Sequence, residues 1–135
     1  MVNNNFKKKM SIFEDCAFSN GRSDEQIVKA EKELNLKFSK EYVEYLKEVG
    51  LARVNAYELT GICPDNKNLD VVYKTKLEKS KIEVPNDWYL VLDDGYCGQM
   101  IWQDSKGFIY LTKDGYKFTK INDSIFEFLK DVIKS

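Results

Sequence analysis

Asp93 and Asp94 are the only adjacent pair of aspartates in this chain of 135 residues, and paired carboxylates are one of the few catalytic devices open to it. The chain contains no histidine, which excludes Ser-His and Cys-His nucleophile pairs and every histidine metal site. The pair directly precedes Gly95, and acidic residues followed by glycine are typical of turns. The sequence therefore favours a turn over a catalytic pair, and we expect no enzymatic activity.

Signatures of metal and cofactor binding are also missing from the sequence. The three cysteines, Cys16, Cys63 and Cys97, form no CxxC pair, and neither GxxxxGK[ST] nor GxGxxG occurs. An odd number of widely spaced cysteines is typical of reduced cytoplasmic thiols rather than of a disulfide framework. We expect no cofactor and no metal.

The composition narrows the class of protein and the kind of partner. The chain is 43% hydrophobic and 13% aromatic, which predicts a folded domain. No apolar run approaches the roughly 20 residues of a membrane span, and no apolar segment follows the N-terminal lysines, so we expect no signal peptide. The balance of 21 basic against 22 acidic residues argues against direct binding of nucleic acid. We expect a cytoplasmic protein without a membrane partner, and its oligomeric state, monomer or dimer, stays open.

One stretch of this nearly neutral chain is locally acidic. No Lys or Arg lies between Lys81 and Lys106, whereas five acidic residues do: Glu83, Asp87, Asp93, Asp94 and Asp104. A nuclease presents positive charge to bind phosphates, and an acidic surface steers such a protein into a complex. These acidic residues could belong to ordinary solvated turns or to a surface that binds a partner. Three polar or aromatic neighbours complete the candidate set: Tyr96, Gln99 and Gln103.

The N-terminal half reads as helical. Residues 6–18 place apolar side chains near helical spacing and predict a short amphipathic helix, followed by a turn that ends near residue 22. Ser23 opens a second helix with a Ser-x-x-Gln capping box. Ser39 caps a third helix that ends at Gly50. Four residues of this helix recur at the spacing of a buried stripe: Tyr42, Tyr45, Leu46 and Val49.

The C-terminal half reads mainly as strands. Residues 53–62 alternate loosely and predict a strand, and a short helix, with Asn68 as a possible cap, follows a turn at Cys63. Residues 89–122 then predict an antiparallel meander of four strands with glycine-bearing turns, in which Trp102 belongs to the core. Ile101 would be exposed if the opposite face of this sheet were open.

A last helix, which Asn122 or Asp123 would cap, completes the pattern. Helices and strands that are segregated in this way indicate an α+β fold, here with a mostly antiparallel sheet of about five strands flanked by the helical hairpin and the C-terminal helix. We expect a single domain over 1–135, with an N-terminal helix and turn over 1–22 and a core over 23–135.

Two stretches of this sequence, in this order, match the characteristic pattern of a known family. In the first, IVKAEKELNLKFSKEYVEYLKEVG, seven residues match that pattern: Glu31, Leu34, Leu36, Phe38, Tyr42, Leu46 and Gly50. In the second, VPNDWYLVLDDGYCGQMIWQD, seven more match: Pro85, Asp87, Val91, Asp93, Gly95, Gly98 and Trp102. FIYLTKDG and the final helix follow as in the family. The chain resembles the SUKH superfamily of Smi/Knr-like domains over about residues 23–135, although Ser39-Lys40 replaces the usual proline.

The resemblance implies an α+β SUKH fold and a non-enzymatic role. Bacterial members of the superfamily are similar to immunity proteins, which bind and neutralise a cognate toxin, often a nuclease or deaminase. A eukaryotic branch resembles regulators of cell-wall synthesis and signalling. The short chain favours the bacterial branch, with a cognate toxin protein as partner and an interaction or signalling module as the alternative. No catalytic residue is carried over by the resemblance.

Overall fold

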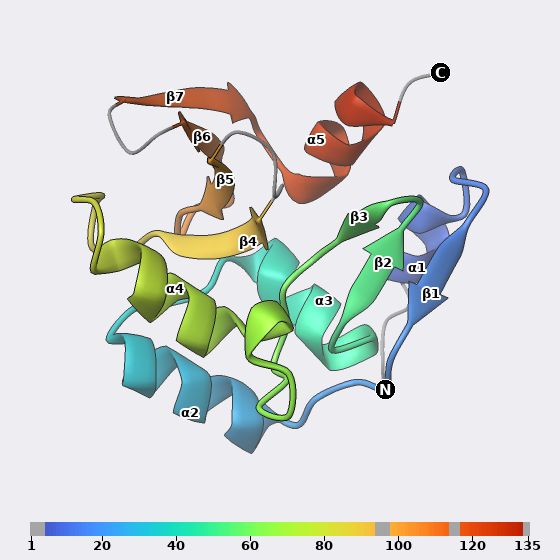
Figure 1. Ribbon diagram of the computed structural model, residues 1–135. Helices are drawn as coiled ribbons and strands as arrows, with labels where there is room; N and C mark the ends of the chain where they lie inside the picture. Colours follow the sequence, from blue (N-terminus) through green and yellow to red (C-terminus); the bar gives the residue numbers. More distant parts are fainter. Residues whose placement is uncertain (1–4, 94–97, 114–116, 134–135) are drawn as a thin grey trace.

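The structure, a computed structural model, describes residues 5–93, 98–113 and 117–133. The elements follow in the order α1 (Asn5–Met10), β1 (Cys16–Phe18), α2 (Asp24–Leu34), α3 (Lys40–Glu48), β2 (Ala52–Val54), β3 (Tyr57–Glu58), η1 (Lys67–Leu69), α4 (Val71–Lys79), β4 (Tyr89–Asp93), β5 (Gln99–Gln103), β6 (Ile109–Lys113), β7 (Lys117–Asn122) and α5 (Ile125–Val132). In Figure 1, β4–β7 lie above α4 and α2, and the small sheet β1–β3 lies to one side with α1. The α+β class predicted from the sequence is confirmed.

The N-terminal helix is shorter than the predicted helix over 6–18. It ends at Met10, and Cys16 begins a strand that pairs antiparallel with β2. Phe6 and Met10 are buried, and the Glu48 carboxylate of α3 accepts the backbone N–H of Phe6 at 3.0 Å. The helical prediction failed beyond Met10 because strand pairing with a distant segment leaves no trace in the local spacing of apolar residues.

Residues 53–62 form a hairpin and its continuation rather than one strand. β2 and β3 pair antiparallel, with Arg53 opposite Glu58, and Asn55 adopts a left-handed backbone (φ 53°) in the turn between them. β1 pairs with the other edge of β2, which gives a three-stranded sheet in the order β1-β2-β3. The strands are therefore divided between two sheets instead of forming one sheet of about five.

The predicted meander is confirmed. β4, β5, β6 and β7 pair antiparallel in chain order, and every side chain from Tyr89 to Leu92 is buried, as expected for a strand that is covered on both faces. Trp102 is fully buried, which confirms its assignment to the core. Ile101 is buried as well, because the inner face of the sheet packs into the main core.

Thr60 joins the two sheets. Its backbone N–H donates to the carbonyl of Val91 at 2.8 Å, and its hydroxyl donates to the carbonyl of Leu90 at 2.7 Å. The phenol of Tyr45 donates to the Thr60 carbonyl at 2.6 Å, and the phenol of Tyr42 hydrogen-bonds the Thr60 hydroxyl at 3.0 Å. These contacts cover the β4 edge of the four-stranded sheet, whereas β7 forms its other edge.

The helical hairpin α2–α3 matches the prediction from the sequence. Ser23 and Gln26 form the reciprocal capping box, and the Ser39 hydroxyl accepts the N–H of Tyr42 at the start of α3. Gly50 follows α3 with a φ of 68°, as a left-handed terminator requires. The predicted stripe is wholly buried: Tyr42, Tyr45, Leu46 and Val49.

Two predicted caps are displaced by a short distance along the chain. Asp70, not Asn68, caps α4, and Ser124, not Asn122 or Asp123, caps α5. All five residue positions carry side chains that are favourable at a helix N-terminus. Which of them becomes the cap depends on where the preceding segment ends and the helix can begin. The sequence does not show that position.

A buried polar network connects α3, the four-stranded sheet and α5. Glu41 accepts hydrogen bonds through Oε1 from the amide of Gln103 and the N–H of Ile125, both at 2.8 Å, and through Oε2 from the N–H of Phe126 at 3.2 Å. A carboxylate at this place satisfies the free N–H groups of the first turn of α5 and interacts favourably with the helix dipole. Glu41 thus fixes the position of α5 against α3.

Gln103 extends this network to the sheet. Its Oε1 accepts from the phenol of Tyr89 at 2.7 Å and from the hydroxyl of Ser39 at 3.0 Å. Its Nε2 donates to the carbonyl of Gly107 at 2.9 Å as well as to Glu41. No described buried side-chain N or O atom lacks a partner, so the network is complete among the described residues.

Replacing Glu41 with Ala should destabilise the fold and release α5 selectively. The substitution leaves the amide of Gln103 and two N–H groups of α5 without an acceptor. These unpaired polar groups should lower the free energy of unfolding by about 2–4 kcal/mol in total. Urea unfolding measures the loss of free energy, and hydrogen exchange should show the largest increase at Ile125 and Phe126. Uniform exchange across the chain would contradict the assignment of Glu41 to α5.

Stability should also depend on pH through Glu41. Burial raises the pKa of its carboxyl above the ordinary value, against the opposing hydrogen bonds from Ile125, Gln103 and Phe126. The folded state then binds a proton more tightly than the unfolded state. The contribution of this group to stability is fully present below the ordinary value, about 4.3, and is lost as pH rises through the folded pKa.

A matched variant isolates this effect. The unfolding free energy of the protein minus that of the Glu41→Gln variant should fall as pH rises across that window. A difference that is constant, or that rises with pH, would show that the Glu41 pKa is not raised in the folded state.

Candidate functional site

Three of the acidic residues predicted as a partner surface lie at opposite ends of the four-stranded sheet, with Asp87 and Asp104 at one end and Asp93 at the other. Tyr89 pairs with Gln103 and Asp93 pairs with Met100, so the start of β4 adjoins the end of β5. Asp87 therefore lies near the β5–β6 turn, where its Oδ2 accepts from the backbone N–H and the hydroxyl of Ser105 at 3.2 and 3.0 Å. Asp93 lies at the other end of β4, about 13 Å from Tyr89 by strand rise.

Asp93 is engaged within the fold. Its carboxylate pairs with the ammonium of Lys74 at 2.7 Å, and the Lys74 side chain is only 9% exposed. This pair attaches α4 to β4 together with the hydroxyl of Thr75, which accepts the N–H of Leu90 at 2.9 Å. Asp93 thus neutralises a buried lysine, and its charge is largely compensated.

Asp104 organises the turn between β5 and β6. Its Oδ1 accepts the backbone N–H groups of Lys106 and Phe108, both at 3.0 Å, and its Oδ2 accepts the phenol of Tyr110 at 3.0 Å. Burial raises the pKa of Tyr110 to about 12, reinforced by the negative charges of Asp104 and Asp87. Asp104 itself is buried and acts as a turn residue.

The remaining predicted residues differ in their accessibility. Glu83 is exposed in the α4–β4 connection and makes no hydrogen bond or ion pair with any described residue. Gln99 is half-buried at the start of β5. Gln103 is fully buried in the network that holds α5, so it is not part of the surface that we propose below. Asp94 and Tyr96 lie outside the described residues, and the candidate surface on the described chain reduces to Glu83, Asp87 and Gln99.

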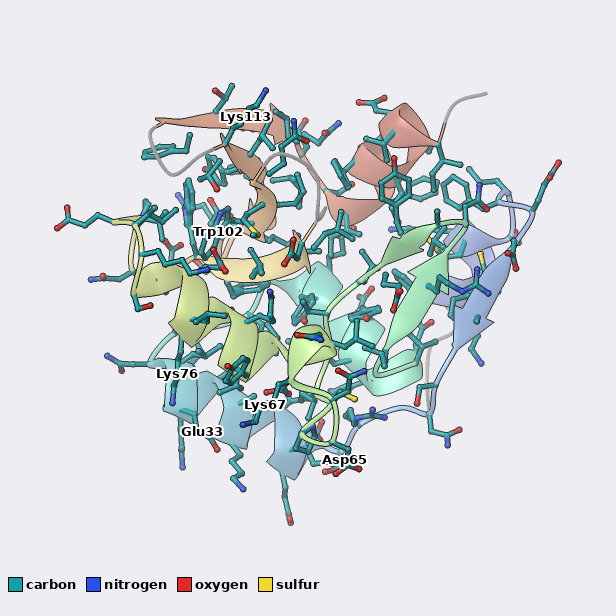
Figure 2. All side chains as sticks on the ribbon, viewed as in Figure 1. Glu33, Asp65, Lys67, Lys76, Trp102 and Lys113 are labelled. Carbon is teal, nitrogen blue, oxygen red and sulfur yellow. The ribbon has the colours of Figure 1, made fainter. Side chains whose placement is uncertain are left out.

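An aromatic cluster on the outer face of the sheet was missed by the sequence reasoning. The rings of Trp88 and Tyr110 stack with centroids 4.2 Å apart, and Phe118 meets Trp88 edge-on at 4.8 Å. Trp102 of β5, which Figure 2 labels above β4, lies 6.1 Å from Trp88. Phe118 is 52% exposed, although Trp88 is 2% exposed. The alternation of aromatic and polar residues in YKFTKI was the available signal.

No group of three or more Cys, Asp or Glu side chains in the described part of the chain is placed to hold a metal ion. The carboxylates that come together at the β5–β6 turn serve hydrogen bonds of the fold. Within the described ranges, no helix is long and apolar enough to cross a membrane. Aromatic residues are enriched at protein interfaces, and this outer face exposes part of an aromatic cluster.

Comparisons with known proteins agree with this architecture. A crystal structure of a protein from Pseudomonas syringae pv. tomato is similar over 93% of this chain and 96% of that chain, with a TM-score of 0.71 and 14% sequence identity, a likeness that shows the fold alone. A comparison with curated proteins finds no match. The family model SUKH_5, described as SMI1-KNR4 cell-wall, matches residues 5–134. This match extends through the N-terminal helix and both sheets, and the chain therefore belongs to the SUKH superfamily.

Proposed function

We propose that this protein is an immunity protein that binds a cognate toxin domain, such as a nuclease or a deaminase, and neutralises it in the cytoplasm by surface complementarity, without catalysis. The observation that carries the proposal is the outer face of the four-stranded sheet. It presents Phe118 and the half-buried Tyr110 to solvent, with Asp87 and Glu83 nearby. Membership of the superfamily supports a protein partner.

The acidic residues that remain accessible fit a cationic partner. Glu83 has no compensating charge within the described residues, and Asp87 uses one carboxylate oxygen for Ser105. Enzymes that act on nucleic acids expose lysine and arginine in their clefts. An inhibitor with acidic groups at its interface gains association rate from this complementarity.

Co-expression tests the proposal directly. Cells that produce the toxin domain encoded beside the gene for this protein should survive only when this protein is co-produced, and the two chains should co-purify. Survival without a complex would contradict neutralisation by binding. Death despite co-production, with every neighbouring toxin gene, would favour the alternative, an interaction module of the cell-wall regulator type, which agrees with the family's description as SMI1-KNR4 cell-wall.

A second prediction concerns the rate of association. The Glu83→Gln variant should bind the toxin domain about 2–5 times more slowly at low salt, because one steering charge is removed, and the difference should vanish at high salt. Stopped-flow fluorescence measures the rate. Glu14→Gln is the matched control, since Glu14 is equally exposed but lies between α1 and β1. Equal slowing of both variants would show that overall charge, not this surface, sets the rate.

A further inference from the structure

Four of the partly exposed aromatic rings in the described part of the chain carry one of the protein's own lysines. The pairs, each with the distance from ammonium to ring centroid, are Lys120 on Phe108 at 4.1 Å, Lys130 on Phe126 at 4.9 Å, Lys67 on Tyr73 at 5.2 Å and Lys7 on Phe18 at 5.9 Å. An ammonium or guanidinium within about 6 Å of a ring centroid is attracted by the electron-rich face. No described lysine or arginine lies over Phe118. Of the two exposed aromatic rings in the described part of the chain, Phe118 is the more exposed, at 52% against 40% for Tyr73.

Phe118 is held firmly from behind. Trp88 meets it edge-on at 4.8 Å, Tyr110 lies 6.4 Å away at nearly a right angle, and Trp88 stacks on Tyr110. In β7 the residue pairs with Thr112 of β6. A rigid ring that needs no ordering on binding is a favourable anchor, because little side-chain entropy is lost.

Carboxylates lie beside this ring cluster. Asp87 precedes Trp88 in the chain and acts electrostatically on the phenol of Tyr110. Its Oδ2 accepts from Ser105, and no described group hydrogen-bonds its Oδ1. Glu83 is exposed between Ile82 and Val84, which both pack against the cluster around Trp88. Asp87 therefore borders the aromatic rings, and Glu83 is an exposed acidic residue in the segment that leads to them.

Two lysines lie near this face. Lys120 lies opposite Tyr110 in the β6–β7 register, and its ammonium pairs with Asp123 at 2.8 Å while it covers Phe108. Lys79 donates to the carbonyl of Asn86 at 2.9 Å and interacts electrostatically with Asp87. Asp123 therefore compensates Lys120, whereas Lys79 offsets part of the charge of Asp87 and forms no ion pair with Glu83.

We infer that the outer face of the four-stranded sheet, centred on Phe118, is the docking surface for an arginine-bearing segment of the protein partner. This inference rests on the proposed function for the identity of the partner. A guanidinium is planar and weakly hydrated, so it stacks on a ring and donates to a carboxylate at the same time, whereas an ammonium does so less well. Phe118 supplies the ring, and Asp87 and Glu83 supply the acceptors.

Binding of the toxin domain tests the surface. Phe118→Ser should raise the Kd about tenfold, since hydrophobic and cation–π contacts at an anchor are both lost. Tyr73→Ser is the matched control, because it removes an exposed aromatic ring from α4 that already carries Lys67. Urea unfolding of both variants checks that the fold is retained. An unchanged Kd for Phe118→Ser in a complex that still protects cells would overturn this inference and leave the proposed function standing.

A second experiment does not depend on the toxin. Titration of the ¹⁵N-labelled protein with a tri-arginine peptide should shift the amide signal of Phe118 and the indole signal of Trp88, and tri-lysine should shift them less. The shifts should be lost in Phe118→Ser and retained in Tyr73→Ser. If the shifts are confined to Phe118 and Trp88 but no toxin domain binds, the result would support the docking surface and contradict the proposed function. Shifts elsewhere, or self-association through β7 that Phe118→Ser abolishes, would overturn the inference.

Discussion

The placement of α5 depends on one partly buried carboxylate. Glu41 lies on α3, yet its oxygens bind the first turn of α5 and the amide of Gln103 on β5. Through Gln103 the same network reaches Tyr89 and Ser39. Because buried polar groups are costly when they lack a partner, this arrangement admits one relative position of helix, sheet and C-terminal helix. The inner face of the sheet is thereby closed, and the docking surface that we propose is on its outer face.

The acidic residues fall into two groups: those that the fold uses and those that remain exposed. The β5–β6 turn needs an acceptor for its N–H groups, and Asp104 provides it. The docking of α4 buries Lys74, and Asp93 compensates that charge. Both carboxylates stabilise the fold and contribute little to an exposed surface. Glu83 and Asp87 lie outside these constraints, and Asp87 borders the aromatic layer that ends at Phe118.

The sequence predicted local features well and long-range pairings poorly. The capping box at Ser23 and the stripe from Tyr42 to Val49 are set by spacing within a helix, and both were found. Cys16 was placed in a helix because its pairing with β2 is not encoded locally. Gln103 was predicted to lie at the surface. The alternation of residues along a strand shows which side chains share a face of the sheet, but it does not show that this face packs against Ser39 and Glu41.

The central claim is that this SUKH protein acts by binding, through the outer face of its four-stranded sheet. Hydrogen exchange of the protein, free and in complex with its toxin domain, tests that claim most directly. Our account predicts that protection on binding is concentrated in residues 81–88 and 117–122 and is weak in α2. Protection concentrated in α2 or in β1–β3, with no change in β7, would contradict it.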